Sequence, residues 1–284
     1  MAIQRKELRS HSYIIFGGTK GIGRLICDSL AERRAQFTVA ARTKADLKAQ
    51  KDSYRGQGCI INVVAADVRN EPQIKAVFAA HKRFFRKPAD VIINCAAVQG
   101  PVGNAWGIDT AGFKETIDIN LTGTFNVAKT AVKQLLRTRQ GSIILFSGGG
   151  AAYGRSRFSP YAASKAAVVR LVETIAVELE EADSKNIIIN AVAPGGVKTM
   201  MTEEIIKAGI KAGKPALAEA REIMRTGGTP PEALLKLIDF LSDTTKTGVL
   251  SGRLIHVRED YTLCASCSNT SYEAGKLRIV PLTT

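Results

Sequence analysis

Residues 13–23, YIIFGGTKGIG, indicate the fold class, because an apolar run ends there in a turn rich in glycine. Residues 13–16 form a short, undiluted apolar segment of the kind that makes a buried strand. The turn opens a segment with helical spacing, 21–33. Glycines between strand and helix allow a sharp turn, close approach of the backbone to a pyrophosphate, and tight packing. The unpaired N–H groups at the start of such a helix favour phosphate, so the stretch predicts a dinucleotide site.

The rest of the chain repeats this alternation of short apolar runs and longer amphipathic segments. The apolar runs are 13–16, 37–41, 60–65, 91–95, 143–146, 187–192 and 254–257, and the amphipathic segments include 21–33, 71–85, 111–137 and 159–181. Undiluted β-branched runs predict strands covered on both faces, and their alternation with helices predicts right-handed crossovers in one parallel sheet. We therefore predict an α/β fold: a Rossmann-type doubly wound sheet of about seven strands, in a single domain over residues 1–284.

Two segments depart from this rhythm. Residues 199–228 are helical in character and include Met200, Met201 and Met224, at a place where the pattern expects only a loop. An insertion at the carboxyl end of a strand predicts a small helical lid over a substrate. The tail from about 258 to 284 has no counterpart in the repeating pattern.

Composition excludes several classes of protein. The 284 residues are 45% hydrophobic and 23% charged, as in an ordinary globular chain. No apolar run approaches the roughly 20 residues that span a bilayer, and no apolar stretch follows the basic residues of segment 1–11. Five scattered cysteines predict reduced thiols. Cys264 and Cys267 form a lone pair, whereas a closed zinc site needs four ligands, so we predict no metal. We expect a cytoplasmic protein.

The net charge of +14, from 40 basic and 26 acidic residues, favours anionic partners in general. An ordinary solubilising surface is the simplest interpretation. Basic and aromatic residues interleave only in HKRFFRK, residues 81–87. Because this segment ends a helical stretch, where cations suit the helix dipole, we interpret it as a helix end. We predict neither a nucleic-acid nor a membrane partner.

The second predicted strand ends in the residues Ala40-Ala41-Arg42-Thr43, without a carboxylate. A carboxylate at this place would bind the ribose hydroxyl of NAD and repel a 2′-phosphate, whereas Arg42 offers a permanently charged fork. Lys20, in the glycine turn, can reach the same phosphate. The alternative is that Arg42 merely solvates a strand end. We predict NADP in preference to NAD.

The segment YAASK, residues 161–165, places Tyr161 and Lys165 one turn apart on one helix face. A second such pair, Tyr272 and Lys276, lies in the tail, and we interpret it as coincidental. A cation about 5 Å from the phenol is expected to lower its pKa by two to three units from about 10. Tyr161 can then exchange a proton with a carbonyl oxygen while hydride moves to or from the carbon. The hydroxyl of Ser147, which ends a buried strand, would hold that oxygen.

With these motifs the sequence resembles the short-chain dehydrogenase/reductase family, in its single-domain Tyr-x-x-x-Lys branch, from about residue 12 to 257. Further matching motifs are Asp67-Val68, Asn94-Cys95-Ala96-Ala97, Asn120 within INLTG at 119–123, and PGGVKT at 194–199. The chain departs from the family at Phe16, usually threonine, at Ala97, usually glycine, and in the three glycines 148–150 that follow Ser147.

The resemblance implies roles for these residues. Asp67 and Val68 would contact the adenine, Asn120 would order a water chain to the lysine, and 194–199 would hold the nicotinamide carboxamide. Lys165 would also bind the ribose hydroxyls. The expected catalytic residues are Asn120, Ser147, Tyr161 and Lys165. The expected coenzyme-binding residues are Gly17, Thr19, Lys20, Gly21, Ile22, Gly23, Arg42, Asp67, Val68, Asn94, Ala96, Tyr161, Lys165, Pro194, Gly195, Val197 and Thr199.

The function predicted from these residues is interconversion of a ketone or aldehyde and an alcohol, as an NADPH-dependent reductase. The alternatives are a non-catalytic, dinucleotide-binding regulatory protein and a nucleotide-sugar-modifying enzyme on the same fold. A serine hydrolase is disfavoured because Leu145, not glycine, precedes Ser147 by two positions. The family also implies a homodimer or homotetramer through the helices beginning near Ala111 and Ser159.

The substrate is expected above the strand ends, among the segments 99–107, 148–158 and 199–228. Trp106 and Phe158 are candidates for an apolar wall, and the alternative is that they are ordinary packing residues. Arg155 and Arg157 are candidates for contact with a carboxylate or phosphate, which would make the small-molecule substrate anionic. The alternative, and the simpler interpretation, is that both belong to a solvated loop.

Overall fold

A computed structural model describes residues 11–247 and 250–258 of the protein. Several features singled out in the sequence lie outside this part. They are the N-terminal stretch 1–10, the tail 259–284 with Cys264 and Cys267, and the second tyrosine–lysine pair, Tyr272 and Lys276.

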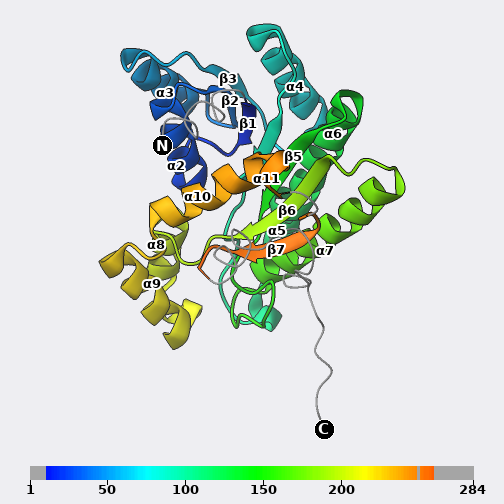
Figure 1. Cartoon of the computed structure of the whole chain (residues 1–284). Coiled ribbons are helices and arrows are strands. Elements are labelled where there is room, and N and C mark those ends of the chain that lie inside the picture. The colour runs from blue at the N-terminus through cyan, green and yellow to red at the C-terminus, as the bar shows by residue number, and fades with distance from the viewer. Residues whose placement is uncertain (1–10, 248–249, 259–284) are drawn as a thin grey trace.

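Seven parallel strands form one sheet in the order β3-β2-β1-β4-β5-β6-β7, which confirms the predicted α/β class (Figure 1). In chain order the strands are β1 Ser12–Phe16, β2 Gln36–Ala41, β3 Asn62–Ala65, β4 Val91–Asn94, β5 Gly141–Phe146, β6 Ile187–Ala193 and β7 Arg253–His256. The third strand is shorter than predicted. Ile60 precedes it and is 73% exposed, so this apolar side chain does not belong to the strand.

Helices cover both faces of the sheet. They are α2 Gly21–Glu32, α3 Lys44–Gly56, α4 Glu71–Phe85, α5 Thr110–Ile117, α6 Gly123–Thr138, α7 Ser159–Glu181, α8 Met200–Ala208, α9 Lys214–Thr226, α10 Pro231–Ser242 and α11 Thr244–Thr247, with short 3₁₀ turns at Ala105–Gly107 and Gly209–Ala212. Lys82 and Arg83 occupy the last turn of α4, so the basic–aromatic segment does end a helix, as predicted.

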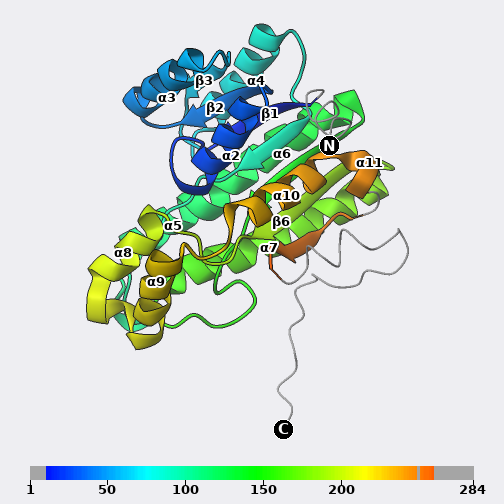
Figure 2. The same cartoon turned by 60° about the vertical axis from the view of Figure 1, so that its left-hand side comes forward.

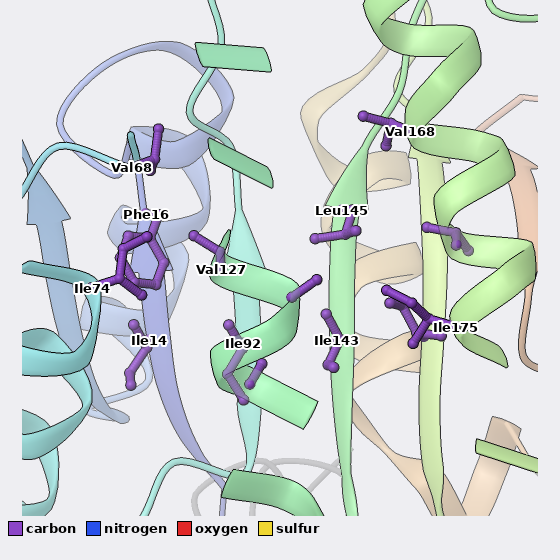
Figure 3. Packing of buried hydrophobic residues seen from close by; sticks show 14 of the residues in the cluster. Ile14, Phe16, Val68, Ile74, Ile92, Val127, Ile143, Leu145, Val168 and Ile175 are labelled. Carbon is purple, nitrogen blue, oxygen red and sulfur yellow. The ribbon is translucent and has the colours of Figure 1, made fainter. Parts of the chain in front are cut away.

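The core has two halves, because side chains alternate across each strand. Ile14 and Phe16 of β1 face the layer of α4, α6 and α7, whereas Tyr13 and Ile15 face the layer of α2, α3 and α10. Figure 3 shows the first half, with side chains of adjacent strands lying beside Val127 of α6. Both halves consist mostly of Ile, Val, Leu and Phe, which is why the strands read as continuous apolar runs.

The strand order reverses direction at the centre of the sheet. β1 pairs with β2 on one side and with β4 on the other, and later strands add outward from each. In a parallel doubly wound sheet the crevice outside the carboxyl ends of the strands at such a reversal is where ligands bind. The turns after β1, β2, β3, β4, β5 and β6, which carry the predicted site residues, all leave the sheet at this edge.

The segment predicted as one helix over 111–137 is interrupted. Helices α5 and α6 are joined by a π-helical turn, Asp118–Thr122, which contains the buried Asn120. Such turns insert an extra residue into a helix and often lie at functional sites. Apolar spacing did not reveal the interruption, because the chain continues in the same direction through it.

The predicted helical insertion over 199–228 is present as α8, a 3₁₀ turn and α9. The two helices lie together at one end of the molecule, near the start of α7 (Figure 2). Ile205, Ala212, Ala216 and Ala220 pack there against Phe158 and Tyr161 in a small core of their own. The insertion therefore touches the helix turn that carries the predicted catalytic tyrosine.

Candidate active site

The turn after β1 requires glycine at particular positions. Gly17 has a φ of +71°, and a Cβ there would lie 2.7 Å from the backbone nitrogen of Ala96. A Cβ on Gly23 would overlap the carbonyl oxygen of Gly17. The turn is fixed to the neighbouring strand by the N–H of Gly17, which donates to the carbonyl of Ala40 at 2.8 Å. Glycine thus brings the turn, the start of α2 and the end of β4 into contact.

A cavity of about 380 Å³, here called the first cavity, opens along this edge of the sheet. Most residues predicted to bind coenzyme or act in catalysis line it: Gly17, Thr19, Lys20, Gly21, Ile22, Gly23, Arg42, Asp67, Val68, Ala96, Ser147, Tyr161, Lys165, Pro194 and Thr199. Segments from six strand ends therefore meet at one place. Cys95, Asp46 and Met201 also line it and were not predicted.

Four predicted residues do not line the first cavity. Gly195 and Val197 line a neighbouring cavity instead, and Asn94 and Asn120 line neither. The buried Asn94 donates to Thr124 Oγ1 at 3.0 Å and accepts from the N–H of Ala96 at 3.2 Å. Asn94 thus holds the end of β4 to α6, so any influence on the coenzyme passes through the backbone.

The far end of the first cavity carries the charges predicted to select the coenzyme. Arg42 is exposed there. Lys20, predicted to help it, is paired with Asp46 of α3 at 3.2 Å. Both carboxylate oxygens of Asp67 accept from Arg69, and these hydrogen bonds lower the pKa of Asp67. The positive charge of Arg69 therefore already offsets the negative charge of the Asp67 carboxylate beside the cavity.

The residues present fit a dinucleotide. The first cavity runs from Arg42 and Asp67 to Ser147 and Tyr161, past the N-terminus of α2. Lys20, the N-cap of α2, provides no side-chain cap, so the first N–H groups of this helix are left for a phosphate. When bound, a nicotinamide dinucleotide supplies or accepts the hydride.

Tyr161 and Lys165 lie side by side on α7, both buried, as their spacing predicts. The Nζ of Lys165 is 5.6 Å from the centre of the phenol ring and donates to the carbonyl of Phe146 at 2.9 Å. Burial raises the pKa of Tyr161 to about 12, and the positive charge of Arg155 opposes this rise. Burial also lowers the pKa of Lys165 to about 8.

The predicted lowering of the Tyr161 pKa by Lys165 is therefore wrong for the chain without coenzyme. Two physical reasons explain the difference. Loss of water around the phenol outweighs the effect of nearby charge, and the ammonium group lies over the ring and bonds to Phe146 rather than to the hydroxyl. Neither the loss of water around the phenol nor the position of the ammonium group can be predicted from the spacing of the two residues in the sequence.

Asn120 reaches Tyr161 through a short chain of hydrogen bonds. Its side chain accepts from the N–H of Val98 at 2.9 Å and donates to Val98 O at 2.9 Å and Ser164 Oγ at 3.1 Å. The Ser164 hydroxyl donates to the carbonyl of Tyr161 at 2.7 Å. Asn120 thus ties the segment after β4 to the first turn of α7, while the water chain to Lys165 stays a prediction.

A second cavity, of about 700 Å³, lies beside the first. The two share Ile22, Gln99, Tyr161, Pro194, Thr199 and Met201 in their walls. The buried Gln99 was predicted only as the edge of a loop, although it lines both cavities. The second cavity is also bounded by the 148–155 segment and by α8 and α9, which belong to segments predicted to surround the substrate, and by the ends of β6 and β7, which were not predicted.

Three predicted substrate contacts do not line this cavity. Trp106 is 88% exposed, and Phe158 is fully buried in the small core. Arg157 lies beside Gly213. Arg155, in contrast, does line the second cavity, as predicted.

Two further observations concern the described part of the chain. Among its residues no group of three or more His, Cys, Asp or Glu side chains is placed to hold a metal ion. None of its helices is long and apolar enough to cross a membrane.

Known proteins share this sequence pattern and fold. A family model described as short chain dehydrogenase matches residues 12–209. The 2,3-dihydro-2,3-dihydroxybenzoate dehydrogenase of Bacillus subtilis is 28% identical, over 75% of this chain and 83% of its own. The chloroplastic NADPH-dependent aldehyde reductase 2 of Arabidopsis thaliana is 31% identical, over 66% and 72%. A crystal structure of a variant actinorhodin polyketide ketoreductase with NADPH has a TM-score of 0.76 and 26% identity, over 87% and 95%.

The chain therefore belongs to the short-chain dehydrogenase family, as its motifs indicated. It is an oxidoreductase that acts on CH–OH or carbonyl groups with NAD(P).

Proposed function

We propose that the protein is an NADPH-dependent reductase of a ketone or aldehyde, with Tyr161 as its general acid. One observation carries this proposal: the first and second cavities meet at Tyr161, so a coenzyme in one and a carbonyl compound in the other would both reach its side chain. The NADPH-dependent aldehyde reductase and the ketoreductase among the similar proteins support the same direction and coenzyme.

The chain's own groups suit proton donation. With a pKa of about 12, Tyr161 keeps its proton at neutral pH and can give it to a carbonyl oxygen. The Ser147 hydroxyl donates to the carbonyl of Lys165 at 3.1 Å and would turn from it toward the substrate oxygen. Lys165, buried beside the phenol, contributes positive charge as negative charge develops on that oxygen.

We also propose that NADP is bound in preference to NAD. Arg42 supports this, since its exposed guanidinium lines the far end of the first cavity. Asp46, in the same wall, is offset by its ion pair with Lys20. The net charge of these three groups is +1, which favours a 2′-phosphate over a bare ribose hydroxyl.

The experiment is turnover of NADPH by wild type and by Tyr161→Phe, with a panel of aldehydes, ketones, 3-oxoacyl thioesters and keto-sugars. We expect the variant to lose about 10²- to 10⁴-fold in kcat, the usual contribution of a positioned acid. Its Kd for NADPH should stay near that of wild type, because Tyr161 presents only part of the wall of the first cavity.

Three outcomes would overturn the proposal. Equal turnover by Tyr161→Phe and wild type would remove the tyrosine from the chemistry. Binding of NADPH without turnover of any carbonyl compound would favour the regulatory dinucleotide-binding protein. Turnover confined to nucleotide-linked sugars would favour the nucleotide-sugar-modifying enzyme.

We propose in addition that the protein is a cytoplasmic homodimer or homotetramer. Exposed apolar side chains support assembly: Phe113 on α5, Phe125 on α6 and Val177 on α7 are 37%, 42% and 54% exposed. The free thiols of Cys27, Cys59 and Cys95 suit a reducing compartment. Light scattering after gel filtration measures the assembly, and a monomer at micromolar concentration would refute it.

A further inference from the structure

Arg155 is the cation that lies deepest in the wall of the second cavity. Its side chain is only 17% exposed and stacks on Phe158, with the guanidinium carbon 4.8 Å from the ring centre. It lies close enough to Tyr161 for its charge to favour the ionised phenol. A guanidinium over an aromatic ring is attracted to the face of the ring, while its N–H groups stay available to an anion.

The glycines after Ser147 leave the room that Arg155 occupies. A Cβ on Gly149 would overlap Nη1 of Arg155, and one on Gly150 would lie 3.0 Å from its Cβ. Gly149 and Gly150 thus leave the space in which Arg155 lies.

The partner of Arg155 belongs to another element and is more exposed. Arg155 Nη2 donates to Glu219 Oε2 of α9 at 3.1 Å, and the Glu219 side chain is 50% exposed. Within the described lining of this cavity the charged side chains are Arg155, Arg258 and Glu219. Because the Glu219 carboxylate is half exposed to water, this ion pair contributes little free energy, and a better-placed anion can replace the glutamate.

We propose that Arg155 binds an oxyanion of the substrate, a carboxylate or a phosphate, and that this group takes the place of Glu219. The substrate is then a carbonyl compound with an anionic end, held with its carbonyl toward Tyr161. This inference rests on the proposed reductase activity. Glu219 acts as a competing anion that an acidic substrate must displace, which discriminates against weak anions, whereas a neutral compound leaves the pair of Arg155 and Glu219 in place.

The test compares para-formylbenzoate with its neutral methyl ester, so that the carbonyl stays the same and only the charge changes. The measured quantity is the ratio of kcat/KM for the acid to that for the ester. We expect Arg155→Ala to lower this ratio at least 10-fold, the scale of a lost charge-assisted hydrogen bond. We expect Glu219→Gln to raise it, because the competing anion is gone.

Arg157→Ala is the matched control. Arg157 is two residues away and lies against Gly213 outside the second cavity, so the ratio should stay at the wild-type value.

Gly149→Ala is a second variant that keeps Arg155 but displaces its guanidinium, and it should lower the ratio as well. A second anionic compound, para-formylphenyl phosphate, distinguishes a carboxylate site from a phosphate site. The oxyanion that Arg155 binds is the one whose compound loses more kcat/KM in Arg155→Ala.

The acid-to-ester ratio is expected to fall in Arg155→Ala and to rise in Glu219→Gln. These opposite changes distinguish the proposal from a simple latch, an ion pair that only fastens the loop to α9. A latch would make Arg155→Ala and Glu219→Gln change acid and ester alike, and that result would overturn the proposal. Calorimetric binding of benzoate gives a readout without turnover: it should weaken in Arg155→Ala and persist in Arg157→Ala. Benzoate binding that depends on Arg155 in a protein that reduces no carbonyl would refute the reductase and keep the anion site. If the ester is reduced and the acid-to-ester ratio of kcat/KM is unchanged in Arg155→Ala, the reductase activity stands and the anion site is refuted.

Discussion

Substituting Gly148 by alanine tests whether the position of the Tyr161 hydroxyl controls the reaction. A Cβ on Gly148 would lie 2.7 Å from Tyr161 Oη, whereas ordinary contact begins at 3.4 Å. The hydroxyl must therefore move by about 0.7 Å, or the loop after Ser147 must move away from it by a similar amount. Gly148 is not among the glycines with positive φ, so the backbone itself accepts an alanine.

The expected loss follows from that displacement. A misplacement of about 1 Å at a reacting group can lower the rate about 100-fold, so we expect kcat to fall by about 10- to 100-fold. This corresponds to about 1.4–2.7 kcal/mol in the activation free energy. The assay is single-turnover reduction of an active carbonyl compound at saturating NADPH. The Tm and the Kd for NADPH should stay near the wild-type values.

Gly154→Ala is the control for this variant. It lies in the same loop, and a Cβ there meets no atom within 4 Å. Its kcat should equal that of wild type. Wild-type turnover by Gly148→Ala would refute the reasoning, and so would an equal loss in both variants, because loop stiffness rather than the hydroxyl would then be responsible.

Four other groups give predictions from their charge. Burial lowers the pKa of His81 to about 4, so stability falls as the pH drops from 6.5 to 4. In urea titrations over this pH range, the free energy of unfolding should fall by up to about 3 kcal/mol less in His81→Asn than in wild type. Burial lowers the pKa of Lys165 from 10.5 to about 8, so its charge opposes folding below that pH. Relative to Lys165→Met, wild type should gain up to about 3 kcal/mol of unfolding free energy between pH 8 and 10.5, and a flat difference would contradict the burial argument. For the coenzyme, Arg42→Ala should lower the NADPH-to-NADH ratio of kcat/KM about 10-fold or more. Asp46→Asn should raise it by freeing Lys20, and an unchanged ratio in both variants would refute the NADP assignment.

Those parts of the site that depend on the ends of strands could be predicted from the sequence. A parallel sheet brings the carboxyl ends of its strands to one edge, so the residues after β1, β2, β3, β5 and β6 share the first cavity. Tyr161 and Lys165 could be predicted as neighbours, because helix geometry alone places residues four apart on one face.

Other features depend on distant segments and carried no local signal. Lys20 meets Asp46 across a turn, and Arg155 meets Glu219 of α9, so each pairing needs the folded chain. Gln99 faces both cavities because Asn120 holds the adjacent Val98, a contact between residues 22 apart. The exposure of Trp106 likewise depends on what packs against its loop, and its apolar character predicted the opposite.

The direction of the Tyr161 pKa bears on the direction of the reaction. A pKa of about 12 lies about five units above pH 7, so forming the phenolate in the chain alone costs about 7 kcal/mol. A pKa of about 8 keeps Lys165 mostly charged at that pH. The chain alone thus presents a protonated phenol beside an ammonium group, which is the state needed to protonate a carbonyl oxygen. Oxidation of an alcohol needs the phenolate, so it requires additional positive charge at the hydroxyl. Arg155 supplies part of that charge even while it is paired with Glu219. A substrate oxyanion that replaces Glu219 leaves this contribution nearly unchanged, so the bias toward reduction comes from the burial of the phenol.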